Sequence, residues 1–377
     1  MRDESDNGNI KVFGISILLT IVLAFGRNFI DIRVSWVWVF VVAACLFVVE
    51  ISIHEFGHCA VFLKQGFDIR AVFLMVLVFV KQDGKWCIRR SNMQQMCMGG
   101  MVIPQIPCIN SEEEYQDFRS AYAKALLGGP IATILFTLIT VFICLILGQF
   151  FGDIRSECLL VAFLVIAIGT GFLLSTLKES SNDLGDLKAY RRMKSDSLWS
   201  NNIILNDENN SNLIRNRYTL TRADQFMQEG QFDFTMADFL TNVLELAIET
   251  ENNPLTVKQE KVIHSILKTK DWLERLDQEN YELFGYRLVQ YLIVCEKDYV
   301  QAEDLYKRMI EKIRYKREYY DYYTFQCEQV LGITDHKEYL SQSIHIKTSS
   351  DWMIWNVFKE YYQREERINS RLCSSEV

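Results

Sequence analysis

Proline is scarce in this 377-residue sequence, which contains only four prolines and no low-complexity linker. A proline-rich or Gly/Ser-rich spacer between independent modules is therefore excluded. No clear internal repeat divides the chain. The length favours two domains, or one domain joined to a membrane unit.

Paired cysteines are also missing. The ten cysteines are scattered, and no two of them form a C-x-x-C pair. Several fall inside apolar segments, where a reduced cysteine behaves as a small hydrophobic residue. The pattern favours buried thiols over a disulfide framework or a zinc knuckle.

The chain lacks the positive charge of a nucleic-acid-binding protein. Its formal net charge is −8, and no basic stripe with interleaved aromatic residues is present. We therefore expect no nucleic-acid partner. Residues 1–9 are acidic and polar, and no small-residue cleavage site follows the first apolar run, so we expect no cleaved signal peptide.

Long hydrophobic runs are abundant, but only in the first half of the chain. The mean hydropathy of +0.02 averages an apolar half with a half rich in Asn, Asp, Glu, Lys and Tyr. The candidate membrane spans are residues 12–25, 34–63, 125–150 and 158–177. Four such runs favour a multi-pass protein of the cell membrane over soluble core helices.

The basic residues between these runs predict an orientation in the bilayer. Residues 64–124 hold eight lysines and arginines, whereas the loops 26–33 and 152–157 together hold three. Five more follow directly after residue 177. Because basic loops stay in the cytoplasm, we expect both termini and the polar half to be cytoplasmic.

The second run ends in a metal-binding pattern, H-E-x-x-H, which extends from His54 to His58. Histidines four residues apart lie on one face of a helix, where two neutral imidazoles can share one Zn²⁺. Glu55 between them can act as the catalytic base that takes a proton from the attacking water. Since ionisable groups inside a span are rare and usually functional, the setting strengthens the interpretation.

A zinc site needs a third protein ligand, and the other histidines (His264, His336 and His345) lie in the polar half. Asp183 follows the fourth run in the position of a helix N-cap, and we expect it to be the third ligand. Asp186, one turn further on, is the alternative. Both acids can also be ordinary capping and first-turn residues.

Glu50 lies four residues before His54, on the same helix face and deeper in the membrane. It could hold a ligand imidazole in the correct tautomer. Alternatively, it pairs with a polar group on another span.

A β-hairpin is expected between the second and third runs. Residues 71–80 form an apolar run of strand type, and Asp83-Gly84 separates it from the short run at residues 86–88. An extended substrate could add to the exposed edge of such a sheet. A purely structural hairpin is equally compatible with the pattern.

Beyond residue 195 the pattern is helical and soluble, with apolar residues spaced three and four apart. Expected helices include residues 236–251, 257–276, 280–294, 300–313 and 352–362. Antiparallel pairs of such helices would be similar to tetratricopeptide repeats, although no repeat consensus is present. No catalytic cluster is evident, and we expect a module that docks a cytoplasmic protein partner.

Over roughly residues 10–195 the chain resembles the site-2 protease family of intramembrane zinc metallopeptidases. The matching elements are the H-E-x-x-H pattern, Gly99-Gly100 before a span, Gly129-Pro130 at the start of the next, and an aspartate at a helix start after the last core span. The resemblance implies zinc-dependent proteolysis of a membrane protein or a peptide precursor in the lipid bilayer. It also implies that Gly129, Pro130 and Thr133 contact the substrate.

The sequence departs from the family pattern in two places. Thr133 stands where the family usually has asparagine, and neither Asp183 nor Asp186 is followed by glycine. These departures motivate a second hypothesis, a catalytically inactive membrane scaffold or peptide-export partner. The expected fold is mostly α. Residues 1–195 form a transmembrane core of about four spans with a small β-hairpin, and residues 196–377 form a soluble all-α domain.

Overall fold

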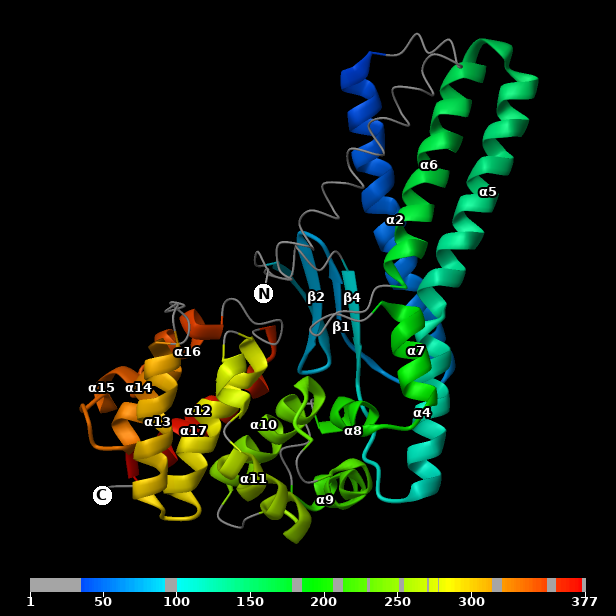
Figure 1. Ribbon diagram of the computed structural model, residues 1–377. Coiled ribbons are helices and arrows are strands. Elements are labelled where there is room, and N and C mark those ends of the chain that lie inside the picture. Colours follow the sequence, from blue (N-terminus) through cyan, green and yellow to red (C-terminus); the bar gives the residue numbers. More distant parts are fainter. Residues whose placement is uncertain are drawn as a thin grey trace.

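A computed structural model describes residues 35–91, 100–177, 185–205, 213–228, 231–250, 254–269, 271–276, 278–313, 321–350 and 357–374. Three long helices stand side by side at one end of the molecule (Figure 1). They are α2 (Trp36–Lys64), α5 (Gly128–Phe150) and α6 (Arg155–Ser175). Within the described part of the chain, these helices are the ones long and apolar enough to cross a membrane. They correspond to three of the four expected spans. The remaining expected span, residues 12–25, lies outside the described residues.

The outward faces of these helices are apolar, and no other described segment covers them. Phe40, Leu138 and Phe142 are each more than 60 % exposed. A water-soluble protein rarely leaves such a large apolar surface open, whereas lipid chains solvate it. The protein is therefore a membrane protein.

The helices α2 and α5 approach each other closely at two glycines. A Cβ atom at Gly57 would lie 2.4 Å from the carbonyl oxygen of Gly128, and a Cβ at Gly128 would lie 2.4 Å from that of Gly57. Small residues at membrane helix crossings allow this backbone contact. The crossing brings the start of α5 against the histidine-bearing turns of α2.

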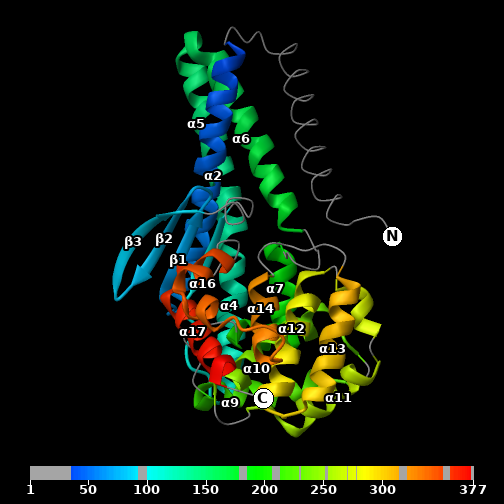
Figure 2. The ribbon, with the colours of Figure 1, turned by 90° about the vertical axis from the view of Figure 1, so that its left-hand side faces the viewer.

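A four-stranded antiparallel sheet lies beside the lower part of α2 (Figures 1 and 2). Its strands are β1 (Ile69–Leu74), β2 (Leu77–Gln82), β3 (Lys85–Arg90) and β4 (Gly100–Pro104), in the order β3-β2-β1-β4. On one face, Val72 joins the core that contains Phe62 of α2. The sheet is larger than the expected hairpin, because β4 pairs with β1 from outside it.

The expectation of one strand over residues 71–80 is wrong. The chain reverses at Met75, whose φ is 48°, and Leu74 pairs with Leu77 across the turn. An apolar run without a turn residue gave no signal for this reversal. The Asp83-Gly84 turn lies where expected, between β2 and β3, with both residues at positive φ.

The opposite face of the sheet is covered by a segment from the far end of the chain. Val357 and Phe358 pack against Phe73 and Val78. The guanidinium of Arg70 on β1 lies 4.2 Å from the centre of the Phe358 ring. The sheet is thus held between α2 and a C-terminal segment.

Two short helices connect the membrane helices to the polar half. Helix α4 (Glu112–Leu126) leads into α5, and α7 (Asp186–Lys194) follows α6 and packs against α4. Beyond them lie the helices α8 (Leu198–Leu205), α9 (Leu213–Ala223), α10 (Phe234–Glu249), α11 (Val257–Thr269), α12 (Glu279–Val294), α13 (Tyr299–Lys312), α14 (Asp321–Val330), α15 (Lys337–Ser341), α16 (Ser343–Ser350) and α17 (Lys359–Ser374).

Four of the expected helices in the polar half begin within two residues of observed helices. Two of the expected ends are wrong. The helix expected over 257–276 stops at Thr269, and a 3₁₀ turn (Asp271–Arg275) follows. The helix expected to end at residue 362 instead runs to Ser374 as α17. Its buried face contains Glu365 and Asn369, which interrupt the apolar periodicity that marks a buried helix.

A buried arginine joins the helices of the polar half. Arg287 of α12 has no exposed surface, and it donates hydrogen bonds to Glu245 of α10 at 2.9 Å and to Glu365 of α17 at 2.5 Å. It also donates to Gln326 of α14 at 3.1 Å. Side chains from four helices therefore meet at the Arg287 guanidinium.

Replacing Glu365 with alanine leaves part of this buried charge unpaired. We expect Glu365→Ala to destabilise the helices around α12 by about 3 kcal/mol, because breaking a buried ion pair exposes the desolvation cost of the remaining charge. Hydrogen exchange of the α12 amides in the full chain measures this loss. Unchanged exchange would show that the arginine does not hold the helices together.

Candidate metal centre

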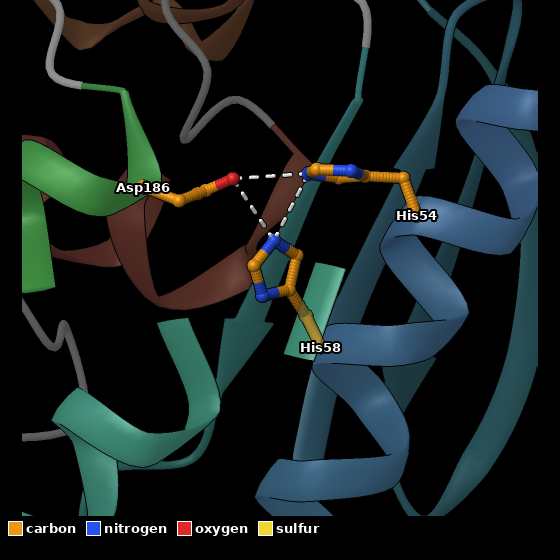
Figure 3. Close-up of side chains that lie close together, drawn as sticks. All are labelled: His54, His58 and Asp186. Atoms are coloured by element: carbon orange, nitrogen blue, oxygen red, sulfur yellow. Dashed lines mark hydrogen bonds and ion pairs between the residues drawn. The ribbon is translucent and has the colours of Figure 1, made fainter. Parts of the chain in front are cut away.

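Three potential ligand atoms converge where α2, α5 and α7 meet (Figure 3). His54 and His58, one turn apart on α2, are both buried, and their Nε2 atoms lie 3.3 Å apart. The Oδ2 atom of Asp186 lies 3.0 Å from Nε2 of His54 and 3.5 Å from Nε2 of His58. These residues form the one group of acids, histidines and cysteines in the described chain that could hold a metal ion.

The spacing of these atoms fits zinc. Tetrahedral zinc with bonds of about 2.0 to 2.2 Å has ligand atoms about 3.3 to 3.6 Å apart. The three observed separations, 3.0, 3.3 and 3.5 Å, lie close to that range. Two imidazoles and one carboxylate also leave a fourth position open, as in catalytic zinc sites.

Gly129, at the start of α5, leaves the space in front of the imidazoles free. A Cβ atom there would lie 2.3 Å from Nε2 of His58 and 2.5 Å from Nε2 of His54. Any side chain at this position would therefore crowd both Nε2 atoms. The sequence resemblance placed Gly129 at the substrate, and the structure places it against both histidines.

The second nitrogen of each imidazole has its own partner. Nδ1 of His58 lies 2.8 Å from the carbonyl oxygen of Ala125, which can only accept a hydrogen bond. Nδ1 of His54 lies 2.9 Å from the hydroxyl of Thr133 on α5. A proton on each Nδ1 leaves both Nε2 lone pairs facing Asp186, which is the tautomer that a metal ligand requires.

Glu50 does not take part in this arrangement. Among the described residues, no hydrogen bond joins it to either imidazole, and its Oε1 atom is buried without a hydrogen-bond partner. The hydroxyl of Thr137 on α5 is also buried without a partner in this part of the chain. Both oxygens lie beside Gly169 of α6, at 3.5 and 2.5 Å from the position of a Cβ atom there. The orienting role expected of Glu50 falls to Thr133 and Ala125.

Glu55 is buried on the side of α2 that faces the sheet. A Cβ atom at Gly100 would lie 2.4 Å from its Oε1 atom, so the first residue of β4 touches the carboxylate. Strand β4 is an edge of the sheet. The candidate base thus lies beside the edge strand of the sheet that the described residues form.

Asp186 is directed to the histidines by the way α7 begins. Gly185 precedes it, and a Cβ atom there would lie 2.3 Å from the carbonyl oxygen of Ser175. The amide of Leu187 donates to the carbonyl of Thr176 at 3.1 Å. The first turn of α7 is therefore fixed against the end of α6.

The charge of Asp186 suits a ligand. Burial opposes its ionisation, but the contacts with the His54 and His58 rings outweigh that effect and hold the pKa of the carboxyl well below its usual range. Metal binding needs the deprotonated carboxylate. Of the two acids considered from the sequence, the structure places Asp186 at the histidines, and Asp183 lies outside the described residues.

Two histidines, an aspartate and an intervening glutamate on membrane-associated helices are typical of a membrane-embedded metallopeptidase. The model of peptidase family M50 matches residues 42–358, which is most of the chain. The chain therefore belongs to peptidase family M50, the site-2 protease family, and membership implies intramembrane metallopeptidase activity. No curated protein and no solved structure matches the chain.

Adding one methyl group at Gly129 tests whether the space between the imidazoles holds a metal. We expect Gly129→Ala to weaken zinc binding more than about 10-fold, because its Cβ would crowd both Nε2 atoms. Chelator competition on the purified protein measures the affinity. Gly148→Ala on the same helix is the control, since its Cβ would meet nothing closer than 3.5 Å. Equal effects of the two variants would contradict the site.

The hydrogen bond that His54 Nδ1 donates to the Thr133 hydroxyl predicts a second effect on metal binding. We expect Thr133→Val to weaken zinc binding about 10-fold, because the imidazole loses the partner that fixes its tautomer. Thr133→Ser keeps the hydroxyl and should bind zinc like the wild type. The same competition assay compares the two variants. If Thr133→Val binds zinc as tightly as the wild type, Thr133 does not orient the His54 ring for metal binding.

Proposed function

We propose that this protein is a zinc-dependent intramembrane endopeptidase. The observation that carries the proposal is the triangle of His54, His58 and Asp186, whose ligand atoms lie 3.0, 3.3 and 3.5 Å apart. His54, His58 and Asp186 would hold the Zn²⁺. A bound zinc ion would polarise the scissile carbonyl and lower the pKa of the attacking water.

In the proposed reaction Glu55 moves the proton. Its carboxylate accepts a proton from the attacking water and returns it to the nitrogen of the leaving amine. Gly129 keeps the approach to the histidines open, and Thr133 and Ala125 hold the imidazoles in place. Pro130 lies buried in the same turn of α5 and limits the shape of that approach.

The substrate reaches this site in an extended form. In a helix the scissile carbonyl is already hydrogen-bonded, so the segment must unwind before cleavage. The first residue of β4, Gly100, lies against Glu55. The outer edge of this strand offers backbone groups to which an extended segment can pair. The substrate class we propose is a membrane protein or a membrane-associated peptide precursor.

The distribution of basic residues supports placement of the polar half in the cytoplasm. The metal centre then opens toward the cytoplasmic side of the bilayer. The helices after residue 196 would form a separate domain that docks a cytoplasmic protein partner.

Replacing Glu55 with glutamine separates the protease from an inactive scaffold. We expect Glu55→Gln to bind one zinc ion per chain and to lose cleavage by at least about 100-fold, because the amide cannot accept the proton. Mass spectrometry of membrane fractions from cells expressing each form identifies proteins that accumulate uncut with the variant. Metal analysis of both purified forms is the control.

The two hypotheses give different results in this comparison. Stoichiometric zinc together with cleavage that depends on Glu55 would end the scaffold hypothesis. Wild-type protein without zinc, or identical fragments from both forms, would end the protease hypothesis.

A further inference from the structure

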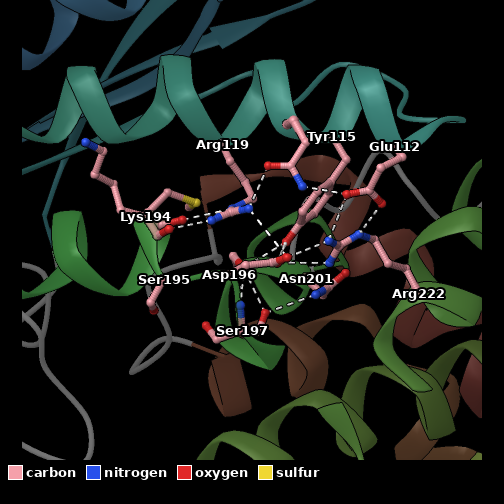
Figure 4. A network of polar contacts seen from close by, with 12 residues as sticks. Glu112, Tyr115, Arg119, Lys194, Ser195, Asp196, Ser197, Asn201 and Arg222 are labelled. Carbon is pink, nitrogen blue, oxygen red and sulfur yellow. Dashed lines mark hydrogen bonds and ion pairs between the residues drawn. The ribbon is translucent and has the colours of Figure 1, made fainter. Parts of the chain in front are cut away.

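Helix α7 carries Asp186 at its first residue, and its other end is enclosed by charged side chains (Figure 4). This polar clamp consists of Asp196, just past the end of α7, with Arg119, Glu112 and Tyr115 of α4 and Arg222 of α9. The helix is only nine residues long. Any displacement of its end therefore also moves the carboxylate at its start.

Helix α4 provides one side of the clamp. Arg119 donates to the carbonyl oxygens of Met193 at 2.9 Å and Lys194 at 2.6 Å, in the last turn of α7. These carbonyls have no partner within the helix, so the guanidinium completes its C-terminal end. Ala125, on the same helix α4, holds the ring of His58. One rigid element thus positions a histidine and the helix that carries Asp186.

Helix α9 provides the other side. Both terminal nitrogens of Arg222 donate to the Asp196 carboxylate, at 3.0 and 2.7 Å. A bidentate pair of this kind is strong and fixes orientation as well as distance. The Arg222 side chain is only 3 % exposed, and its guanidinium stacks 3.7 Å from the centre of the Tyr115 ring. Glu112 binds the same guanidinium from the opposite side at 2.9 Å.

The conformation of Asp196 depends on these partners. Its φ is 53°, in the left-handed region that a residue other than glycine seldom adopts. Aspartate and asparagine tolerate this region better than other side chains. The turn after α7 is therefore held in an uncommon conformation, with its carboxylate aimed at Arg222.

We propose that Arg222 is a positioning residue for the metal centre. By binding Asp196 it fixes α7, so that Asp186 meets His54 and His58 only when α9 is docked on α4. The helices after residue 213 thereby control whether the third ligand is in place. The inference rests on the proposed metal site, and it does not depend on proteolysis.

The test compares zinc affinity in full-length variants purified in detergent. Arg222→Met keeps the length and packing of the side chain but removes its charge, and Asp196→Asn keeps the shape and tolerates the positive φ. We expect each variant to bind zinc about 10-fold more weakly, because a mobile ligand costs affinity. The double variant should lose little more than either single variant, since both remove one interaction.

A second measurement does not involve the metal. In metal-free protein, the α7 amides should exchange hydrogen faster in both variants than in the wild type, while the α12 amides should be unchanged. Arg222→Lys restores one charged contact and should lie between the methionine variant and the wild type.

Arg70→Met is the matched control. It breaks a different contact between the C-terminal helices and the membrane half, the 3.6 Å ion pair with Glu360, and it lies on β1 rather than on α4, α7 or α9. Zinc affinity should stay at the wild-type value in this variant.

Wild-type zinc affinity and wild-type α7 exchange in both Arg222→Met and Asp196→Asn would overturn the proposal. If Arg222→Met also accelerates exchange in α12, the substitution has unfolded the helices of the polar half. The zinc affinity and α7 exchange of Asp196→Asn then decide whether the proposal holds. If the wild-type protein binds no zinc, the proposed function fails first. The α7 exchange then still shows whether the clamp orders the helix.

Discussion

Two imidazoles in a membrane helix need partners for all of their nitrogens, and this requirement organises the structure. Hydrocarbon offers no hydrogen bonds, so an unpaired polar group inside it is costly. Both Nδ1 atoms are bound by residues at the junction of α4 and α5, where Ala125 and Thr133 lie. The close crossing at Gly57 and Gly128 brings that junction to α2. With both Nδ1 protons engaged, the two Nε2 lone pairs and the Asp186 carboxylate face one another, and a shared cation would satisfy all three.

Two of the contacts between the helices of the polar half and the membrane half have different consequences. One contact reaches α7 through Arg222 and Asp196 and so bears on the third ligand. The other reaches the sheet through Val357 and Phe358, behind the strands that lead to β4. A single movement of these helices could therefore alter both the metal site and the surface where an extended segment would pair. This arrangement gives the cytoplasmic docking role proposed for the polar half a physical route to the active site.

The sequence predicted what depends on local pattern. Apolar length marked three of the spans, four-residue spacing marked the histidine pair, and Asp83-Gly84 marked a hairpin. It could not predict the partners of the imidazoles, because the carbonyl of Ala125 has no side-chain signature and lies 67 residues from His58. The clamp was hidden for the same reason, since Arg222 and Asp196 meet only after α9 folds back on α4. The buried Glu365 concealed the true extent of α17 by breaking the apolar stripe.

The two departures from the family pattern take on a different meaning beside the geometry. Thr133 was one reason to consider an inactive scaffold, because the family usually has asparagine there. Its hydroxyl is fully buried and lies 2.9 Å from Nδ1 of His54, so the residue at this position is a partner for a ring of the candidate metal site. The missing glycine after Asp186 has a counterpart in Gly185 before it, where only a residue without a side chain fits against Ser175. A site that had lost its metal would not require a hydroxyl beside His54 or a glycine before Asp186. The presence of Thr133 and Gly185 at these positions therefore favours a site that binds a metal.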